Sequence, residues 1–123
     1  MAPGKYDLHI YRGEDFSLTF LIEVGGVLLD LTGCTILAEI RPLLSRVSLP
    51  VIETFTVTLD GQPTPNAAPT DMEVALTLTD AQTVLIDGYS EGFYDVLVID
   101  TNGVDTYYLS GQVFFHNTVT VKP

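Results

Sequence analysis

The feature that most constrains the fold of this chain is an alternation of apolar and polar residues with a period of two. In segment 16–20, Phe16, Leu18 and Phe20 alternate with Ser17 and Thr19. Successive side chains of a strand point to opposite faces of a sheet, so this pattern predicts a strand with one buried face. The same pattern recurs in segments 6–10, 36–41, 54–59, 72–78, 93–100 and 105–115, and residues 118–121 are expected to add a last strand.

Two dipeptides in the sequence are typical of hairpin turns. They are Gly25-Gly26 and Asn102-Gly103, and each lies between two apolar segments. Glycine and asparagine tolerate the positive φ angles that tight hairpins need. Each pair is therefore expected to join two neighbouring antiparallel strands.

A short helix and one longer loop interrupt the strand pattern. Thr79 and Gln82 match a capping box, which predicts a helix of one or two turns before Gly88. Segment 60–71 contains three prolines and is expected to be a surface loop. Short strands with turn signals about every 8 to 12 residues predict an all-β fold, a single-domain antiparallel β-sandwich over residues 1–123.

The composition excludes some classes of partner. The formal net charge is −11, and between Val47 and Val121 there are ten acidic residues but no lysine or arginine. Phosphate backbones are bound by basic side chains, so we expect no nucleic-acid partner. The acidic surface either keeps the chain soluble or docks onto a basic partner. The first ten residues, MAPGKYDLHI, do not form the apolar run of a signal peptide, and no window of about 20 residues is apolar throughout. We therefore expect no membrane partner.

The residues that carry catalysis or bind metals do not form recognisable motifs. Cys34 is the single cysteine, and no serine or cysteine lies in a nucleophile elbow. Segment 100–105 has the oxygen donors of a calcium loop, but glycine and the final acid are misplaced for an EF-hand. Neither His9 nor His116 has a cysteine or an acidic residue at the spacing of a metal site. We therefore expect no enzyme activity, no metal and no cofactor.

The strands at 93–100 and 105–115 predict an apolar surface on the outside of the sandwich. Asp95 favours an outward position because a lone carboxylate resists burial, and this choice sets the alternation of both strands. The side chains then expected to point inward are Tyr94, Val96, Val98, Tyr107, Leu109, Val113 and Phe115. Those expected on the outer face are Leu97, Ile99, Tyr108 and Phe114. Exposed apolar patches mark contact surfaces, so these four form the candidate protein interface, unless segment 43–50 or the proline-bearing loop covers them.

Two stretches of the sequence resemble a recurring module of bacteriophage virions. They are LTGCTILAEIRP and LTLTDAQTVLIDGYSEGFYDVLVIDTNGVDTYYLSGQVFFHNTVTV. Across about residues 15–121 the chain is similar to the N-terminal domain of baseplate upper proteins and to short tail proteins of many tailed phages. The resemblance implies an Ig-like β-sandwich that fixes fibres or receptor-binding proteins to a tail, with no catalytic residue. The chain departs from the longer members in lacking a C-terminal helix or fibre extension, and its segment Pro63–Pro69 is unusual.

The function expected from these observations is assembly. The chain is predicted to be a structural adaptor of a tailed-phage virion, in the tail, baseplate or fibre-attachment region, assembled in the host cytoplasm. Its expected partners are other virion proteins, with the chain present as a homo-oligomer or as repeated copies in a symmetric assembly. The alternatives are a carbohydrate-binding β-sandwich for host recognition and a capsid decoration protein.

Overall fold

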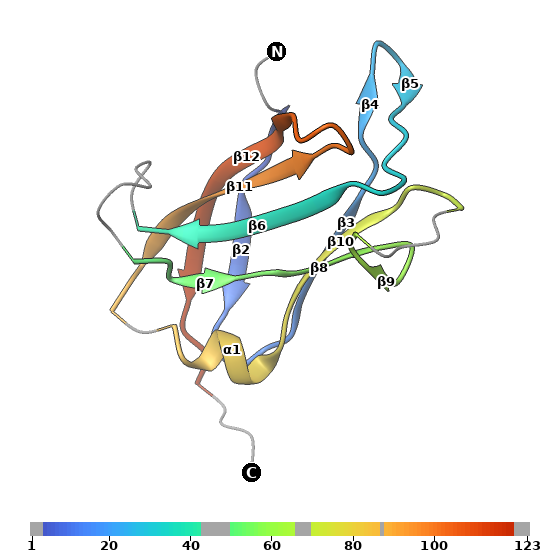
Figure 1. Ribbon diagram of the computed structural model, residues 1–123. Coiled ribbons are helices and arrows are strands. Elements are labelled where there is room, and N and C mark those ends of the chain that lie inside the picture. The colour runs from blue at the N-terminus through green and yellow to red at the C-terminus, as the bar shows by residue number, and fades with distance from the viewer. Residues whose placement is uncertain (1–3, 43–49, 66–69, 87, 120–123) are drawn as a thin grey trace.

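The computed structural model describes residues 4–42, 50–65, 70–86 and 88–119 of the chain, which form two β-sheets packed face to face (Figure 1). The larger sheet has the strand order β1-β12-β11-β6-β7, and β2 also pairs with β12. Its strands are β1 (Gly4–Lys5), β2 (Leu8–Tyr11), β6 (Thr35–Arg41), β7 (Glu53–Thr54), β11 (Glu91–Ile99) and β12 (Asp105–His116).

The smaller sheet has the strand order β3-β10-β8-β9. Its strands are β3 (Phe16–Phe20), β8 (Thr56–Leu59), β9 (Gln62–Pro63) and β10 (Val74–Leu78). A separate hairpin consists of β4 (Glu23–Val24) and β5 (Val27–Leu28), and one helix, α1, spans Asp80–Val84. No helix in the described part of the chain is long and apolar enough to cross a membrane.

The order in which the chain visits the two sheets is that of an immunoglobulin-like sandwich. The chain passes from β3 in the smaller sheet to β6 in the larger one, returns through β8 and β10, and then crosses to β11 and β12. Immunoglobulin domains place strands B, D and E in one sheet and strands C, F and G in the other, in the same chain order. The prediction of an all-β, Ig-like β-sandwich with one short helix is therefore confirmed.

The core lies between the two sheets and is built from alternating side chains. On β11, Tyr94, Val96 and Val98 are buried, as predicted. The other strands contribute Leu8, Ile10, Ile36, Ala38, Ile40, Leu59, Val74, Leu76, Leu78, Val113 and Phe115. Removing this apolar surface from water is the main driving force for the sandwich to form.

The local turn signals are confirmed. Gly25 and Gly26 have φ angles of 61° and 80° and join β4 to β5. Gly103, with φ of 79°, lies in the turn between β11 and β12. Thr79 caps α1, and the side chain of Gln82 accepts a hydrogen bond from the Thr79 backbone N–H at 2.9 Å, which completes the capping box.

Three strand predictions need correction. The strand predicted over 54–59 is divided, because β7 pairs with β6 in the larger sheet whereas β8 pairs with β10 in the smaller one. Phe55 lies at this crossing, with 4% of its surface exposed. Thr118 and Val119 lie in no strand, and residues 120–121 fall outside the described part.

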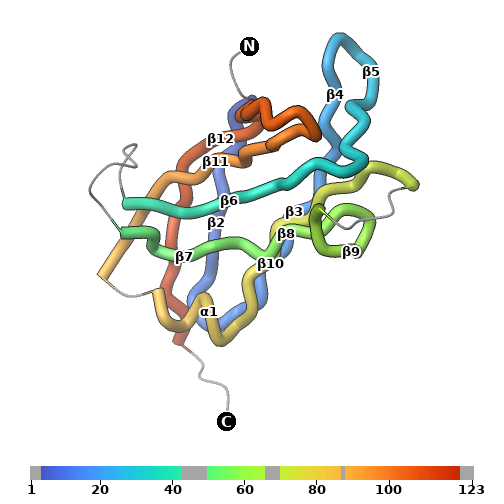
Figure 2. The backbone as a smooth tube through the Cα atoms, in the orientation of Figure 1, coloured from blue at the N-terminus to red at the C-terminus, as the bar shows by residue number. Residues whose placement is uncertain are grey.

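The pairing of the N-terminal strands is the third correction. Both β1 and β2 run parallel to β12, so the larger sheet is mixed rather than purely antiparallel. Figure 2 shows the blue N-terminal tube beside the red tube of β12. This pairing brings the first and last strands of the chain together and positions the surface described next.

Candidate interaction surface

The register of the larger sheet arranges its outward-pointing side chains in rows across the strands. We call this side of the sheet, which points away from the smaller sheet, the outer face. Leu97 pairs with Leu37 on β6 and with Tyr107 on β12, so these three form one apolar row. Ile99 lies on the same face, two residues further along β11. Leu37 keeps 46% of its surface exposed, whereas the other three are half-buried.

A row of polar side chains lies next to the apolar row on the outer face. Asp95 pairs with Glu39 on one side and with Ser110 on the other. Ser110 in turn pairs with Lys5, whose ammonium group donates to the Ser110 hydroxyl at 3.2 Å. Arg41 forms a surface ion pair with Glu39 at 3.2 Å. The outer face therefore combines an apolar row with a charged row that can orient a partner.

Four rings lie in a row at the end of the outer face that is away from the apolar row, and we call them the aromatic ladder. Their order is Phe114, His9, His116 and Tyr11, with centroid separations of 5.2, 5.2 and 4.7 Å and interplanar angles of 21° to 22°. The Nδ1 atom of His9 and the Nε2 atom of His116 are 2.9 Å apart. This hydrogen bond requires one ring nitrogen to donate and the other to accept, so it fixes the two imidazoles relative to each other.

Three of the four predicted interface residues lie on the outer face, and one does not. Leu97, Ile99 and Phe114 are half-buried there. Tyr108 instead packs against the core, so its predicted outward position is wrong. The reason is an irregularity of a kind typical of a β-bulge, because Val96 pairs with Leu109 but Leu97 pairs with Tyr107.

The same irregularity corrects the prediction for Tyr107. This residue was expected to point inward, but it shares the outer face with Leu97 because the strand gains one residue at Tyr108. Leu109, Val113 and Phe115 lie beyond the shift and keep their predicted inward positions. The apolar row therefore survives, with Tyr107 in place of Tyr108.

The sequence pattern did not predict the aromatic ladder. His9 and His116 lie 107 residues apart and come together only because β2 pairs in parallel with β12. The alternation of segment 6–10 does place His9 on the face opposite Leu8 and Ile10. That alternation predicts the face of the sheet on which each ring lies, but it does not predict which strand lies beside it.

Other polar groups serve local structure. The Asp100 carboxylate accepts from the backbone N–H groups of Asn102 and Val104 at 2.8 and 2.9 Å, so it closes the hairpin. Burial raises the pKa of the Cys34 thiol, and the carboxylates of Asp100 and Asp30 add to the shift. Among the described residues no three histidine, cysteine or acidic side chains form a group that could hold a metal ion.

Comparison with known proteins gives a likeness of fold at low identity. No family model and no curated protein matches the chain. One similar solved structure is the SrpA adhesin of Streptococcus sanguinis, with 15% identity, 90% of this chain covered and a TM-score of 0.49. The match covers 55% of the adhesin chain. Another, from work on multimeric cell-adhesive interactions of VGSC beta subunits, has 10% identity, coverage of 93% and 92%, and a TM-score of 0.39.

Proposed function

We propose that this chain is a structural adaptor of a tailed-phage virion, in the tail, baseplate or fibre-attachment region, and that it assembles through the outer face. The observation that carries the proposal is the row of Leu37, Leu97 and Tyr107, which lies beside charged side chains on a sheet surface. Interfaces typically combine such an apolar centre with a polar surround. The resemblance of the sequence to virion modules supplies the class of assembly.

The experiment that tests this function is fractionation of purified particles of the phage that encodes the chain. Tails and heads are separated, and the chain is quantified in each by mass spectrometry. The proposal predicts a fixed number of copies per tail. Recovery in the heads would instead support a capsid decoration protein, and absence from washed particles would contradict a structural role.

A further inference from the structure

The smaller sheet has an open edge at β3. In the described part of the chain, β3 has β10 as its neighbour on one side and no strand on the other. Immunoglobulin domains of the constant type place a first strand beside this position, but here β1 and β2 pair with β12 in the other sheet. An edge strand presents unpaired backbone N–H and C=O groups, which are a template for a further strand.

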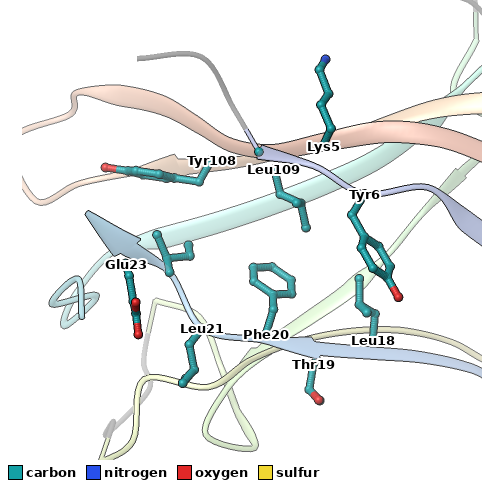
Figure 3. A pocket seen from close by; sticks show the side chains of 11 residues that line it. Lys5, Tyr6, Leu18, Thr19, Phe20, Leu21, Glu23, Tyr108 and Leu109 are labelled. Carbon is teal, nitrogen blue, oxygen red and sulfur yellow. The ribbon is translucent and has the colours of Figure 1, made fainter. Parts of the chain in front are cut away.

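An apolar pocket of about 470 Å³ lies beside this open edge. It is lined by β3 and the residues after it on one side and by β1, Tyr6 and β12 on the other. Figure 3 shows Phe20 and Leu109 pointing toward each other across the pocket, and Leu18 and Tyr6 doing the same. Because Leu18 and Phe20 are two residues apart on β3, a strand added beside them would point alternate side chains into the pocket.

The charges around the pocket favour a basic occupant. Glu23 lies at the rim, and the Lys5 side chain points away from the pocket (Figure 3). The Lys5 ammonium donates to Ser110, on the larger sheet. The chain as a whole carries a net charge of −11, which repels a second copy and attracts a cationic segment.

We propose that the β3 edge and this pocket bind an extended segment of a partner protein by β-strand addition. Two apolar side chains of the segment, two residues apart, enter the pocket beside Leu18 and Phe20, and basic side chains flank them on the outward side. Backbone hydrogen bonds to β3 provide affinity, and the pocket provides specificity. This site is separate from the outer face and goes beyond the assembly role proposed above.

The test uses two synthetic peptides of the same composition. One is acetyl-Thr-Lys-Val-Thr-Val-Lys-Thr-amide, in which the valines share one face. The control has the same residues with the two valines adjacent, so that one valine must point away. Binding is followed by the ¹H–¹⁵N amide spectrum of the intact protein. The proposal predicts saturable shifts of the Ser17–Leu21 amides with the first peptide and at least tenfold weaker binding of the control.

A pair of protein variants provides a second control. Tyr6 and Tyr11 are both exposed, at 54% and 45%, but Tyr6 lines the pocket and Tyr11 lies in the ladder. Tyr6→Ser should weaken the first peptide several-fold, whereas Tyr11→Ser should leave its affinity unchanged. Affinity weaker than about 1 mM, equal binding of the two peptides, or shifts confined to the outer face would overturn the proposal. Self-association that Tyr6→Ser abolishes would also overturn it, in favour of a second copy.

Discussion

A single missing side chain, at Gly111, allows the N-terminal segment to lie against β12. A Cβ atom at this position would lie 2.1 Å from the Tyr6 carbonyl oxygen. The backbone of Tyr6 is fixed there, because its N–H donates to Ser110 at 3.0 Å and its carbonyl accepts from the Tyr94 hydroxyl at 2.6 Å. Burial raises the pKa of Tyr94, and Asp7 and Tyr6 add to the shift, so this hydroxyl stays protonated as a donor.

Substitution of Gly111 should therefore disturb this packing. Gly111→Ala should destabilise the protein by about 1 to 3 kcal/mol, the usual cost of overpacking, because the Tyr6 backbone must move. The matched control is Gly4→Ala, where the nearest atom to a new Cβ lies at 3.5 Å, and its effect should stay within about 0.5 kcal/mol. Urea unfolding measures both, and equal effects would contradict the described packing.

Asp60 is a second residue on which local structure depends. Its φ angle is 51°, and its carboxylate accepts from the backbone N–H groups of four consecutive residues, Thr70 to Glu73, at 2.5 to 3.1 Å. The hydrogen bond from Glu73 is the largest cause that lowers the pKa of Asp60, followed by those from the other three. The charged carboxylate therefore stabilises the end of the loop that precedes β10.

Because the pKa of Asp60 is lowered, the contribution of its carboxylate to stability should depend on pH. The contribution of Asp60 is fully present above the pKa of an unfolded aspartate and is lost as the pH falls through the lower folded value. Asp60→Asn keeps a residue that tolerates positive φ but removes the charge. We expect the variant to have a lower Tm at pH 7, with the difference from the wild type shrinking below about pH 4. A difference that is constant from neutral pH to pH 2 would refute this role.

At the scale of elements, Arg12 connects three segments at one end of the sandwich. Its guanidinium donates to the carbonyl of Ile86 at 2.5 Å, to the carbonyl of Tyr89, and to Asn117 Oδ1 at 2.6 Å. It also lies 5.9 Å from the centroid of the Phe115 ring. Nearby, the fully buried Thr83 of α1 donates to the carbonyl of Glu14 at 2.7 Å. These contacts hold the helix and the residues after it against the turn between β2 and β3.

Loss of the three hydrogen bonds that the Arg12 guanidinium donates should destabilise this end of the molecule. Arg12→Lys retains the charge but cannot reach three acceptors in different directions. We expect a loss of about 1.5 to 3 kcal/mol in urea unfolding, together with faster hydrogen exchange of the α1 amides. Lys5→Ala, which removes an exposed cation with one hydrogen bond, is the control and should change stability by less than about 0.5 kcal/mol. Equal losses in the two variants would contradict the connecting role.

The elements also show which parts of the structure can be predicted from the sequence. Side-chain alternation and turn residues are local, and they correctly predicted β11, β12, the hairpins and the capping box of α1. The irregularity at Tyr108 leaves no such local signal, so the faces of Tyr107 and Tyr108 were exchanged. The division of segment 54–59 at Phe55 was missed for a similar reason, because the alternation continues while the chain changes sheets.

At the scale of the whole molecule, the pairing between distant strands decides what the surfaces offer. The sequence predicted Leu97, Ile99 and Phe114 on the outer face, since each position follows from the alternation within its own strand. The aromatic ladder and the open edge of β3 both depend on where β1 and β2 pair. That choice is set by contacts across most of the chain length, which a local pattern does not encode.

If the chain assembles through the outer face, a pair of lysine substitutions on that face should prevent assembly. Leu37→Lys and Leu97→Lys together remove two side chains from the apolar row. They also add two positive charges to a chain whose net charge is negative. Leu85→Lys changes the leucine at the C-cap of α1, which has 77% of its surface exposed, and is the control.

The measurement is the number of copies of each variant in purified particles of the phage that we propose as the source of the chain, with circular dichroism to show that each variant is folded. We expect the double variant to fold but to be absent from the particles, whereas Leu85→Lys should be incorporated at the wild-type level. Full incorporation of the folded double variant would contradict the assignment of the outer face as the assembly surface.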